Sequence, residues 1–263
     1  MRLHGSAFHL QAVVEYKIVR SILFNFSFYT FTLFWATALL ITIPIPGRRA
    51  MSRGIWLWTH VVLWMARVIA GIHVEVRGAE NLRRNEAMII VSKHMSDLDA
   101  IMIFHHLPDM TALAKKELFR VPVIGLLLRK LEIVRIDRQS GQAHQEMPRA
   151  IRSIREGTRP LVVFPEGTRT LPGQHRPLKS GAYYLQEEGN LPVVPMATNS
   201  GLHWPRGLAK RRPGRVIYII GAPLAHSTDK AHFMKQVNAQ VMDLSDQLMR
   251  DDPAHVHYPA LMG

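Results

Sequence analysis

An uncharged apolar stretch near the N-terminus constrains the fold of this chain more than any other feature. Residues Ser21–Gly47 contain no Asp, Glu, Lys, Arg or His. Roughly 20 apolar residues in a helix suffice to cross the hydrocarbon core of a bilayer, and Pro44 and Pro46 mark where such a helix should end. The run is long for a secretory signal, and no small-residue cleavage site follows it. We therefore predict an N-terminal membrane-anchoring helix.

A second apolar stretch, Gly54–Ile72, carries His60 and Arg67 and is rich in Trp and Met, which favours an interfacial or re-entrant helix. A hairpin dipping into one leaflet and a full span both stay open, as does a pair of buried core helices in a soluble protein. The positive-inside rule gives no orientation, because basic residues flank the first helix on both sides: Lys17, Arg20, Arg48, Arg49 and Arg53.

After residue 72 the pattern changes to apolar runs of strand length that alternate with helical periodicity. We predict strands at His73–Gly78, Ala87–Ser92, Met110–Lys115, Glu132–Asp137, Pro160–Gly167, Leu191–Thr198 and Arg215–Gly221. We predict helices at Asp97–His106, Glu117–Lys130, Gly141–Glu156, Leu178–Glu188 and Asp229–Arg250. The alternation indicates an α/β fold, with a mixed, mainly parallel sheet flanked by helices. The expected division is membrane-associated helices at 1–72, a catalytic domain at 73–250 and a short, loose tail at 251–263.

Charge and cysteine content narrow the possible partners and chemistry. The 263 residues include 33 Lys and Arg against 20 Asp and Glu, for a net charge of +13, which attracts polyanions. The sequence has no recognisable nucleic-acid-binding motif, and the apolar N-terminus favours lipid. The chain has no cysteine, which excludes a thiolate nucleophile, a disulfide framework and a thiolate zinc site.

Two polar motifs follow predicted strands, where ligands gather in open α/β sheets. In SKHMSDLDA, His94 can act as a general base, and Asp99 can fix its tautomer. Asp97 is a competing carboxylate and a candidate helix cap. In VVFPEGTRT, Glu166, Gly167 and Thr168 precede Arg169, whose guanidinium suits a phosphate. Each motif alone could be an ordinary capped helix or a charged turn.

Together the two motifs resemble those of the glycerolipid acyltransferase family, in particular its 1-acylglycerol-3-phosphate acyltransferases. The His-x-x-x-x-Asp motif at His94 is followed by Phe-Pro-Glu-Gly-Thr-Arg ending at Arg169. Further blocks match in order: Lys116-Glu117-Leu118 with Pro122 and Gly125, Ile136-Asp137-Arg138, Lys179-Ser180-Gly181, and Val193-Val194-Pro195. The likeness covers Gly78–Thr198, and four ordered blocks make it specific.

The resemblance implies transfer of a fatty acyl group from acyl-CoA or acyl carrier protein to the sn-2 hydroxyl of lysophosphatidate, which makes phosphatidate. His94 would be the base and Asp99 its orienting acid, with no acyl-enzyme. The absence of cysteine and of a Gly-x-Ser-x-Gly elbow agrees with that. Substrate-binding roles fall to Lys116, Arg138, Glu166, Gly167, Thr168 and Arg169. We expect no metal or cofactor and no nucleic-acid partner. We expect the enzyme to be bound to the inner membrane, with its catalytic domain on the cytoplasmic face.

Alternative functions remain open from sequence. The acceptor could be another lysolipid, such as a lyso-ornithine lipid or a lysophospholipid with a headgroup. The chain could also be a lipid or thioester hydrolase, or a non-catalytic lipid-binding protein. The basic segment Arg206–Arg215 could dock an acyl carrier protein or lipid headgroups, or be a solvated loop. His105, His106 and His203 come without a spaced ligand set.

Overall fold

The computed structural model describes residues 3–84, 86–136, 148, 151–152, 154–156, 158–208 and 210–262, with side chains from residue 18 onward. Within these residues, seven strands form one sheet in the order β1-β7-β6-β2-β5-β3-β4. The strands are β1 Ile72–Arg77, β2 Ile89–Ser92, β3 Thr111–Lys115, β4 Val134–Ile136, β5 Leu161–Val163, β6 Val193–Thr198 and β7 Gly214–Ile220. β6 and β7 pair antiparallel, and every other neighbouring pair is parallel. The predicted mixed, mainly parallel sheet is confirmed.

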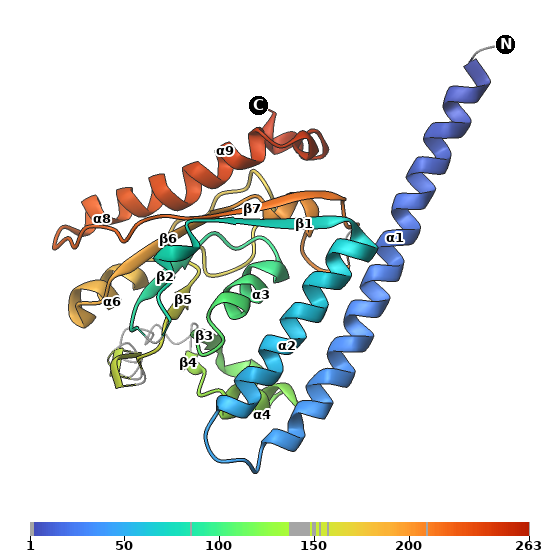
Figure 1. Cartoon of the computed structure of the whole chain (residues 1–263). Coiled ribbons are helices and arrows are strands. Elements are labelled where there is room, and N and C mark those ends of the chain that lie inside the picture. The colour runs from blue at the N-terminus through green and yellow to red at the C-terminus, as the bar shows by residue number, and fades with distance from the viewer. Residues whose placement is uncertain are drawn as a thin grey trace.

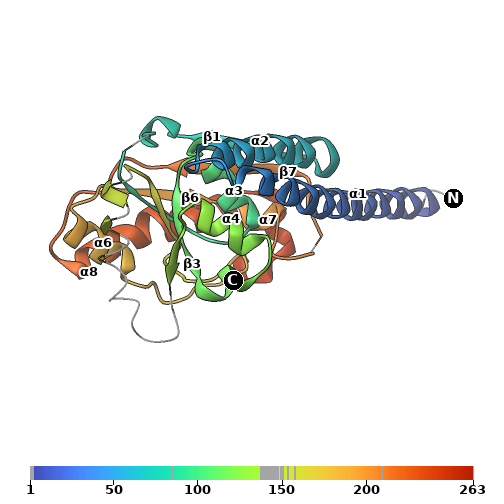
Figure 2. The ribbon, with the colours of Figure 1, turned by 90° about the horizontal axis from the view of Figure 1, so that it is seen from below.

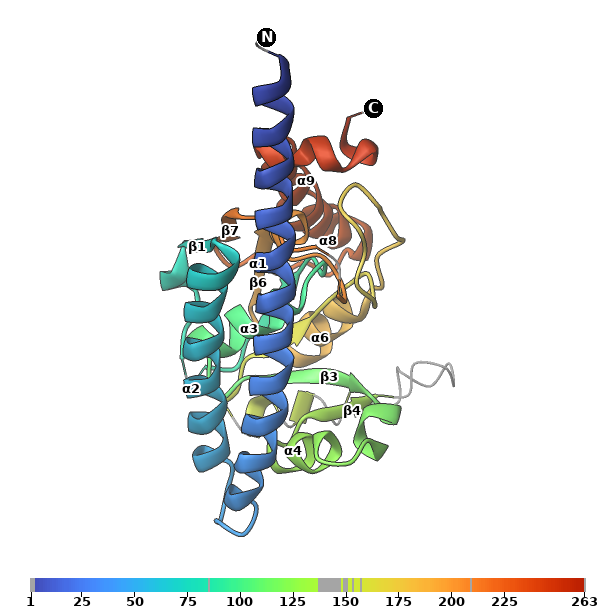
Figure 3. The same ribbon diagram turned by 90° about the vertical axis from the view of Figure 1, so that its right-hand side faces the viewer.

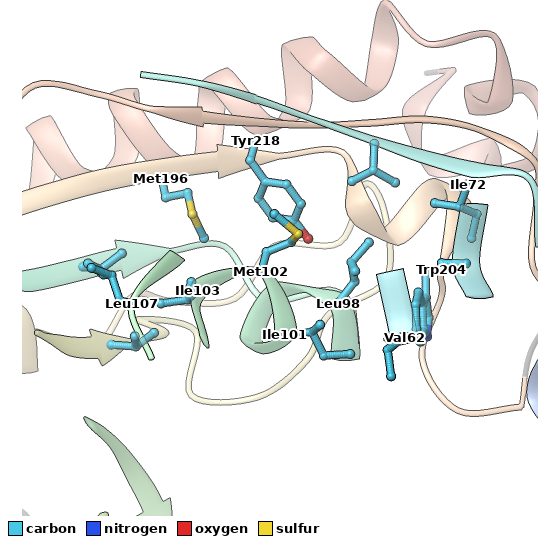
Figure 4. Packing of buried hydrophobic residues seen from close by; sticks show 14 of the residues in the cluster. Val62, Ile72, Leu98, Ile101, Met102, Ile103, Leu107, Met196, Trp204 and Tyr218 are labelled. Carbon is cyan, nitrogen blue, oxygen red and sulfur yellow. The ribbon is translucent and has the colours of Figure 1, made fainter. Parts of the chain in front are cut away.

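Helices cover both faces of the sheet, as the continuous apolar strands require. The helices are α1 Leu3–Ala38, α2 Arg49–Met65, α3 Asp97–His106, α4 Ile124–Lys130, α6 Gly181–Gly189, α7 Ser200–His203, α8 Lys230–Val237 and α9 Leu244–Arg250. Figure 1 shows α8 and α9 on the face opposite α2 and α3. Successive residues of β2 serve the two faces, because Ile90 packs with α2 and α3 whereas Ile89 and Val91 pack with α6 and α8. Figure 4 shows the first of these cores, with Tyr218 pointing from β7 toward α3.

The N-terminal helices α1 and α2 form a hairpin whose inner side lies against the domain (Figures 2 and 3). Phe24 and Phe28 of α1 are buried, and both meet Trp204 edge-on with ring centroids 4.9 and 5.2 Å away. The Trp58 indole of α2 donates to Thr32 Oγ1 of α1 at 3.2 Å. Residues Ile18–Thr42 are long and apolar enough for a membrane span, and 22% of the most apolar window is buried inside the protein. This hairpin is therefore continuous with the core of the domain.

The predicted single helix Glu117–Lys130 is wrong. A 3-10 turn at Lys116–Arg120 is followed by α4, and the backbone between them is extended at Val121 and has φ 64° at Val123. Pro122 explains the break, because proline disfavours the α conformation in the residue before it. Gly125 is required at the start of α4, since a Cβ there would lie 2.3 Å from the Phe119 carbonyl oxygen.

At the C-terminal end, the predicted helix from Asp229 to Arg250 is present, with Asp229 as its N-cap and a π-helical turn at Asn238–Asp243 joining α8 to α9. The expectation of a loose tail is wrong. The Tyr258 hydroxyl donates to the Gly201 carbonyl at 2.9 Å, and Leu261 is buried beside Met95 and Met249. Residues 251–262 thus pack against the segment that follows β2. Most of the predicted helix Gly141–Glu156 lies outside the described residues.

Candidate active site

The sheet topology brings the two sequence motifs together. β2 and β5 are parallel neighbours, so their carboxyl ends meet at one edge of the sheet. His94 follows β2 by two residues, and Glu166 follows β5 by three. The Thr170 amide donates to the His94 carbonyl at 2.9 Å, which joins the two loops directly. Separate motifs in the sequence therefore form a single site.

His94 and Asp99 are in hydrogen-bond contact, with Nδ1 3.1 Å from Oδ2. Asp99 is fully buried, and the same oxygen accepts the amides of Met95 and Ser96 at 2.8 Å each. The His94 ring stacks on Phe164 with centroids 3.9 Å apart and is 19% exposed. With Nδ1 committed to the carboxylate, Nε2 is the nitrogen left to accept a proton.

The start of α3 is built so that Asp99 serves two purposes. Ser96 is the N-cap, and its hydroxyl accepts the Leu98 amide at 3.0 Å, while Asp99 at the third helical position completes a capping box. The candidate cap Asp97 is not the N-cap. Its carboxylate instead pairs with the Arg169 guanidinium. The helix start thus fixes the dyad acid through backbone bonds.

Two further residues hold Asp99, and sequence reasoning missed both. The Ser200 hydroxyl donates to Oδ1 at 2.5 Å and the Tyr218 hydroxyl at 3.1 Å. Burial, followed by the nearby Asp99 charge, raises the pKa of Tyr218 well above its ordinary value, so Tyr218 stays protonated and donates. Neither residue belongs to a recognisable motif. The one available signal was the place of Ser200 two residues after the end of β6.

The loop after β5 turns at Gly167, where φ is +71°, a conformation that favours glycine. A side chain there would also press on Lys179, whose amino group lies 3.0 Å from the position of a Cβ. Glu166 points inward, with its side chain 1% exposed. Thr168 is partly buried in the same loop. Among the proposed substrate-binding residues of this loop, Arg169 is the one whose charged group reaches the surface, at 31% exposed.

The other proposed phosphate-binding residues come from the neighbouring strands. Lys116 follows β3, which pairs parallel with β5, so it lies at the same edge of the sheet as His94. Arg138 lies outside the described residues. The structure therefore brings His94, Asp99 and the Glu166–Arg169 loop together and puts Lys116 at the same edge.

Comparison with known proteins agrees with this geometry. The family model described as "Acyltransferase" matches residues 73–199, which include the dyad and the Glu166–Arg169 loop. A 1-acyl-sn-glycerol-3-phosphate acyltransferase from Pseudomonas aeruginosa is 32% identical over 80% of this chain and 82% of its own length. The chain belongs to the acyltransferase family.

Another relative and a solved structure are also similar to this acyltransferase. A 1-acyl-sn-glycerol-3-phosphate acyltransferase from Limnanthes douglasii is 33% identical over 68% of this chain, and the chain spans 63% of that relative. The crystal structure of a 1-acyl-sn-glycerophosphate (LPA) acyltransferase from Thermotoga maritima has the same fold, with a TM-score of 0.73 and 22% identity. That likeness covers 88% of this chain and 97% of the other.

Two other residues that the sequence analysis singled out, in the basic segment and among the histidines, form contacts within the protein. Arg211 of the basic segment is buried, donates to the Pro205 and Gly207 carbonyls at 2.7 and 2.9 Å, and lies over the Trp204 ring at 5.1 Å. His203 bonds Asp252 at 3.0 Å. In the part of the chain that the structure describes, no three His, Cys, Asp or Glu residues are grouped as metal ligands.

Proposed function

We propose that this acyltransferase moves a fatty acyl group from a thioester donor to the sn-2 hydroxyl of lysophosphatidate, forming phosphatidate. The observation that carries the proposal is the His94–Asp99 dyad beside a loop that presents Arg169 at the surface. A base next to a guanidinium suits an acceptor that has both a hydroxyl and a phosphate. The names of the curated relatives from P. aeruginosa and L. douglasii support the same acceptor.

The chemistry follows from the geometry of the dyad. Nε2 of His94 takes the proton of the acceptor hydroxyl as its oxygen attacks the thioester carbonyl, and Asp99 stabilises the imidazolium that forms. The tetrahedral intermediate collapses, the C–S bond breaks, and the imidazolium returns the proton to the leaving thiolate. The products are an ester and a free thiol, without an acyl-enzyme. The Met95 and Ser96 amides bind Asp99, so the donors that stabilise the oxyanion lie elsewhere.

The substrate contacts are assigned from position. Arg169 and Lys116 hold the acceptor phosphate, and the proposal extends to Arg138, outside the described residues. Gly167 and Thr168 shape the loop around it. Acyl-CoA or an acyl carrier protein is the co-substrate, and the reaction requires no cofactor, because attack and proton return need only the imidazole and the bound substrates.

The proposal places the enzyme on one leaflet of the inner membrane, at the cytoplasmic face, and the α1 helix supports the membrane association. Its outer side is apolar and exposed, with Ile22, Phe26 and Leu33 at 63%, 69% and 69%. Its inner side holds Phe24 and Phe28 against the domain. A full span would draw that domain, with its charged loops, into the bilayer at high cost. Residues 1–72 therefore act as an in-plane anchor for the catalytic domain.

The deciding experiment offers purified enzyme both donors and a panel of lysolipids, with products identified by mass spectrometry. Phosphatidate formation from lysophosphatidate, lost in His94→Ala, is the expected result. If the enzyme preferred a lyso-ornithine lipid or a headgroup-bearing lysophospholipid to lysophosphatidate, that lipid would be assigned as the acceptor instead. Release of free fatty acid without any acceptor would show a hydrolase instead.

A further inference from the structure

Lys93, the residue directly before the catalytic histidine, is completely buried, with its side chain 0% exposed. Buried lysines are rare unless their charge is paired. The Lys93 ammonium lies 3.5 Å from Glu166 Oε2 and 3.7 Å from the Met242 sulfur on the turn before α9. It is thus enclosed between the sheet edge and the C-terminal helix, with no route to a substrate, and the reaction above does not use it.

The partner carboxylate, Glu166, connects Lys93 to the backbone of His94. Glu166 Oε2 accepts the Thr170 hydroxyl at 2.9 Å, and Oε1 accepts the His94 amide at 3.4 Å. The Thr170 amide in turn donates to the His94 carbonyl at 2.9 Å. Both backbone polar groups of the catalytic histidine are therefore bonded to the loop that begins with Glu166.

Burial makes this network dependent on the lysine. An ionised carboxylate with its side chain 1% exposed is strongly unfavourable without a compensating charge and hydrogen bonds. Lys93 supplies that charge. Asp246 of α9 also faces Lys93: burial raises the pKa of Asp246, and the positive charge of Lys93 opposes that increase. The direct ion pair of Lys93 is with Glu166, whereas Asp246 has its own partner in His175, whose Nε2 lies 3.1 Å from its Oδ2.

We propose that Lys93 and Glu166 are positioning residues, a buried brace that sets the His94 backbone, and with it the imidazole, against the Phe164–Thr170 loop. The proposal deepens the function proposed above and rests on it. Glu166 then acts through His94 and makes no contact with the acceptor phosphate. The burial of its carboxylate supports this, since both oxygens already face protein donors and a phosphate beside a carboxylate would meet like-charge repulsion.

The test compares substitutions that keep or remove the Glu166 bond to the His94 amide at constant charge. Lys93→Met leaves Glu166 buried and unpaired. The double variant Lys93→Met/Glu166→Gln restores neutrality and keeps an amide oxygen for the His94 amide, whereas Lys93→Met/Glu166→Leu restores neutrality without it. Lys235→Met, on the exposed side of α8, controls for the loss of a lysine. Each protein is purified in detergent, and Tm, kcat and the KM for lysophosphatidate are measured.

We expect Lys93→Met to lower Tm by about 10 °C, and both double variants to recover most of that loss. The Gln double variant should retain a kcat at least ~10-fold above that of the Leu double variant, because small misplacement of a catalytic base is costly. The KM for lysophosphatidate should agree within about 2-fold in the two. A Leu double variant with the kcat of the Gln variant, or one whose defect lies in acceptor KM, would overturn the positioning role.

The readouts separate this proposal from the proposed function. Recovery of Tm in the double variants tests the Lys93–Glu166 pairing without any substrate. If the wild-type enzyme prefers another acceptor, the kcat comparison is repeated with that acceptor and still decides the role of the brace. If Lys93→Met has the same Tm as the wild type, the two buried charges are not coupled, and the brace is disproved whatever the acceptor.

Discussion

Asp99 and His94 are joined by a hydrogen bond of 3.1 Å between Oδ2 and Nδ1, and the carboxylate in that bond accepts hydrogen bonds from four other protein groups. Its two oxygens are therefore saturated and fixed in direction. A carboxylate held in this way can orient the imidazole without moving during the reaction. The dyad is pre-organised by the fold, which is how enzymes lower the cost of reorganisation.

Removing the base should abolish most of the catalysis. We expect His94→Ala to lower kcat by about 10²–10⁴-fold, because no other group takes the hydroxyl proton. Asp99→Asn should also reduce kcat strongly, since the amide can stabilise neither the imidazolium nor the required tautomer. Single-turnover acyl transfer measures both. Full transfer by purified His94→Ala would end the proposed mechanism.

The hydroxyls that hold Asp99 should affect kcat and leave acceptor binding alone. Hydrogen bonds to a charged group contribute roughly 1.5–3 kcal/mol, and the Tyr218 and Ser200 hydroxyls both donate to Oδ1. We expect Tyr218→Phe to lower kcat by about 10-fold or more with an unchanged acceptor KM. Ser200→Ala should act in the same direction. An effect confined to KM would contradict this role.

The sequence predicted the central strands β2, β5 and β6 well because their continuous apolar runs follow from burial on two faces. It also predicted the helix Asp97–His106 with its observed bounds. It failed at Glu117–Lys130, where helical periodicity outweighed the local effect of Pro122. Periodicity reports which residues are apolar, whereas proline acts on the backbone of its neighbour.

The candidate site was only partly predictable. His94 and Asp99 are close in sequence, so their contact could be inferred. Ser200 and Tyr218 reach Asp99 from more than a hundred residues away, and neither has local features that reveal such a contact. Nothing in the sequence marks Lys93 as a buried residue, and its burial follows from the packing of Met242 and Glu166 around it.

Arg169 should control affinity for the acceptor phosphate. We expect Arg169→Gln to raise the KM for lysophosphatidate by about 10-fold or more, through loss of a charge-assisted hydrogen bond. Asp97 pairs with the same guanidinium and competes with the phosphate. Since an exposed ion pair is worth about 0.2–1 kcal/mol, Asp97→Asn should lower that KM by about 2- to 5-fold. Unchanged values in steady-state kinetics would remove both assignments.

His105 should make the fold sensitive to acid. Burial, followed by the charges of His60, His106 and Arg84, lowers the pKa of His105 to about 4 from 6.5. As the pH falls, the unfolded chain takes up this proton at a higher pH than the folded protein does. The free energy of unfolding is therefore at its full value above pH 6.5 and declines by about 1–3 kcal/mol as the pH falls toward 4. The free energy of unfolding should differ less between pH 7.5 and pH 5.0 in His105→Gln than in the wild type. His232→Gln, on the exposed side of α8, serves as the control. Equal differences in all three would contradict the shift.

Two phenylalanines on α1 separate its structural and membrane-binding sides. Phe24 is fully buried against Trp204, whereas Phe26 is 69% exposed on the opposite side of the helix. Phe24→Ala should lower the free energy of unfolding by about 3–5 kcal/mol, as for other large-to-small core substitutions.

Phe26→Ala should leave stability within about 0.5 kcal/mol but weaken partitioning to phosphatidylglycerol-containing vesicles, because an inserted aromatic side chain contributes about 1.5–3 kcal/mol. Vesicle flotation and denaturant unfolding measure the two effects on the same proteins. If Phe26→Ala bound vesicles like the wild type, the exposed side of α1 would not face lipid. A reversed pattern, with Phe26 stabilising the fold, would place α1 inside a larger protein interface instead of on the leaflet surface.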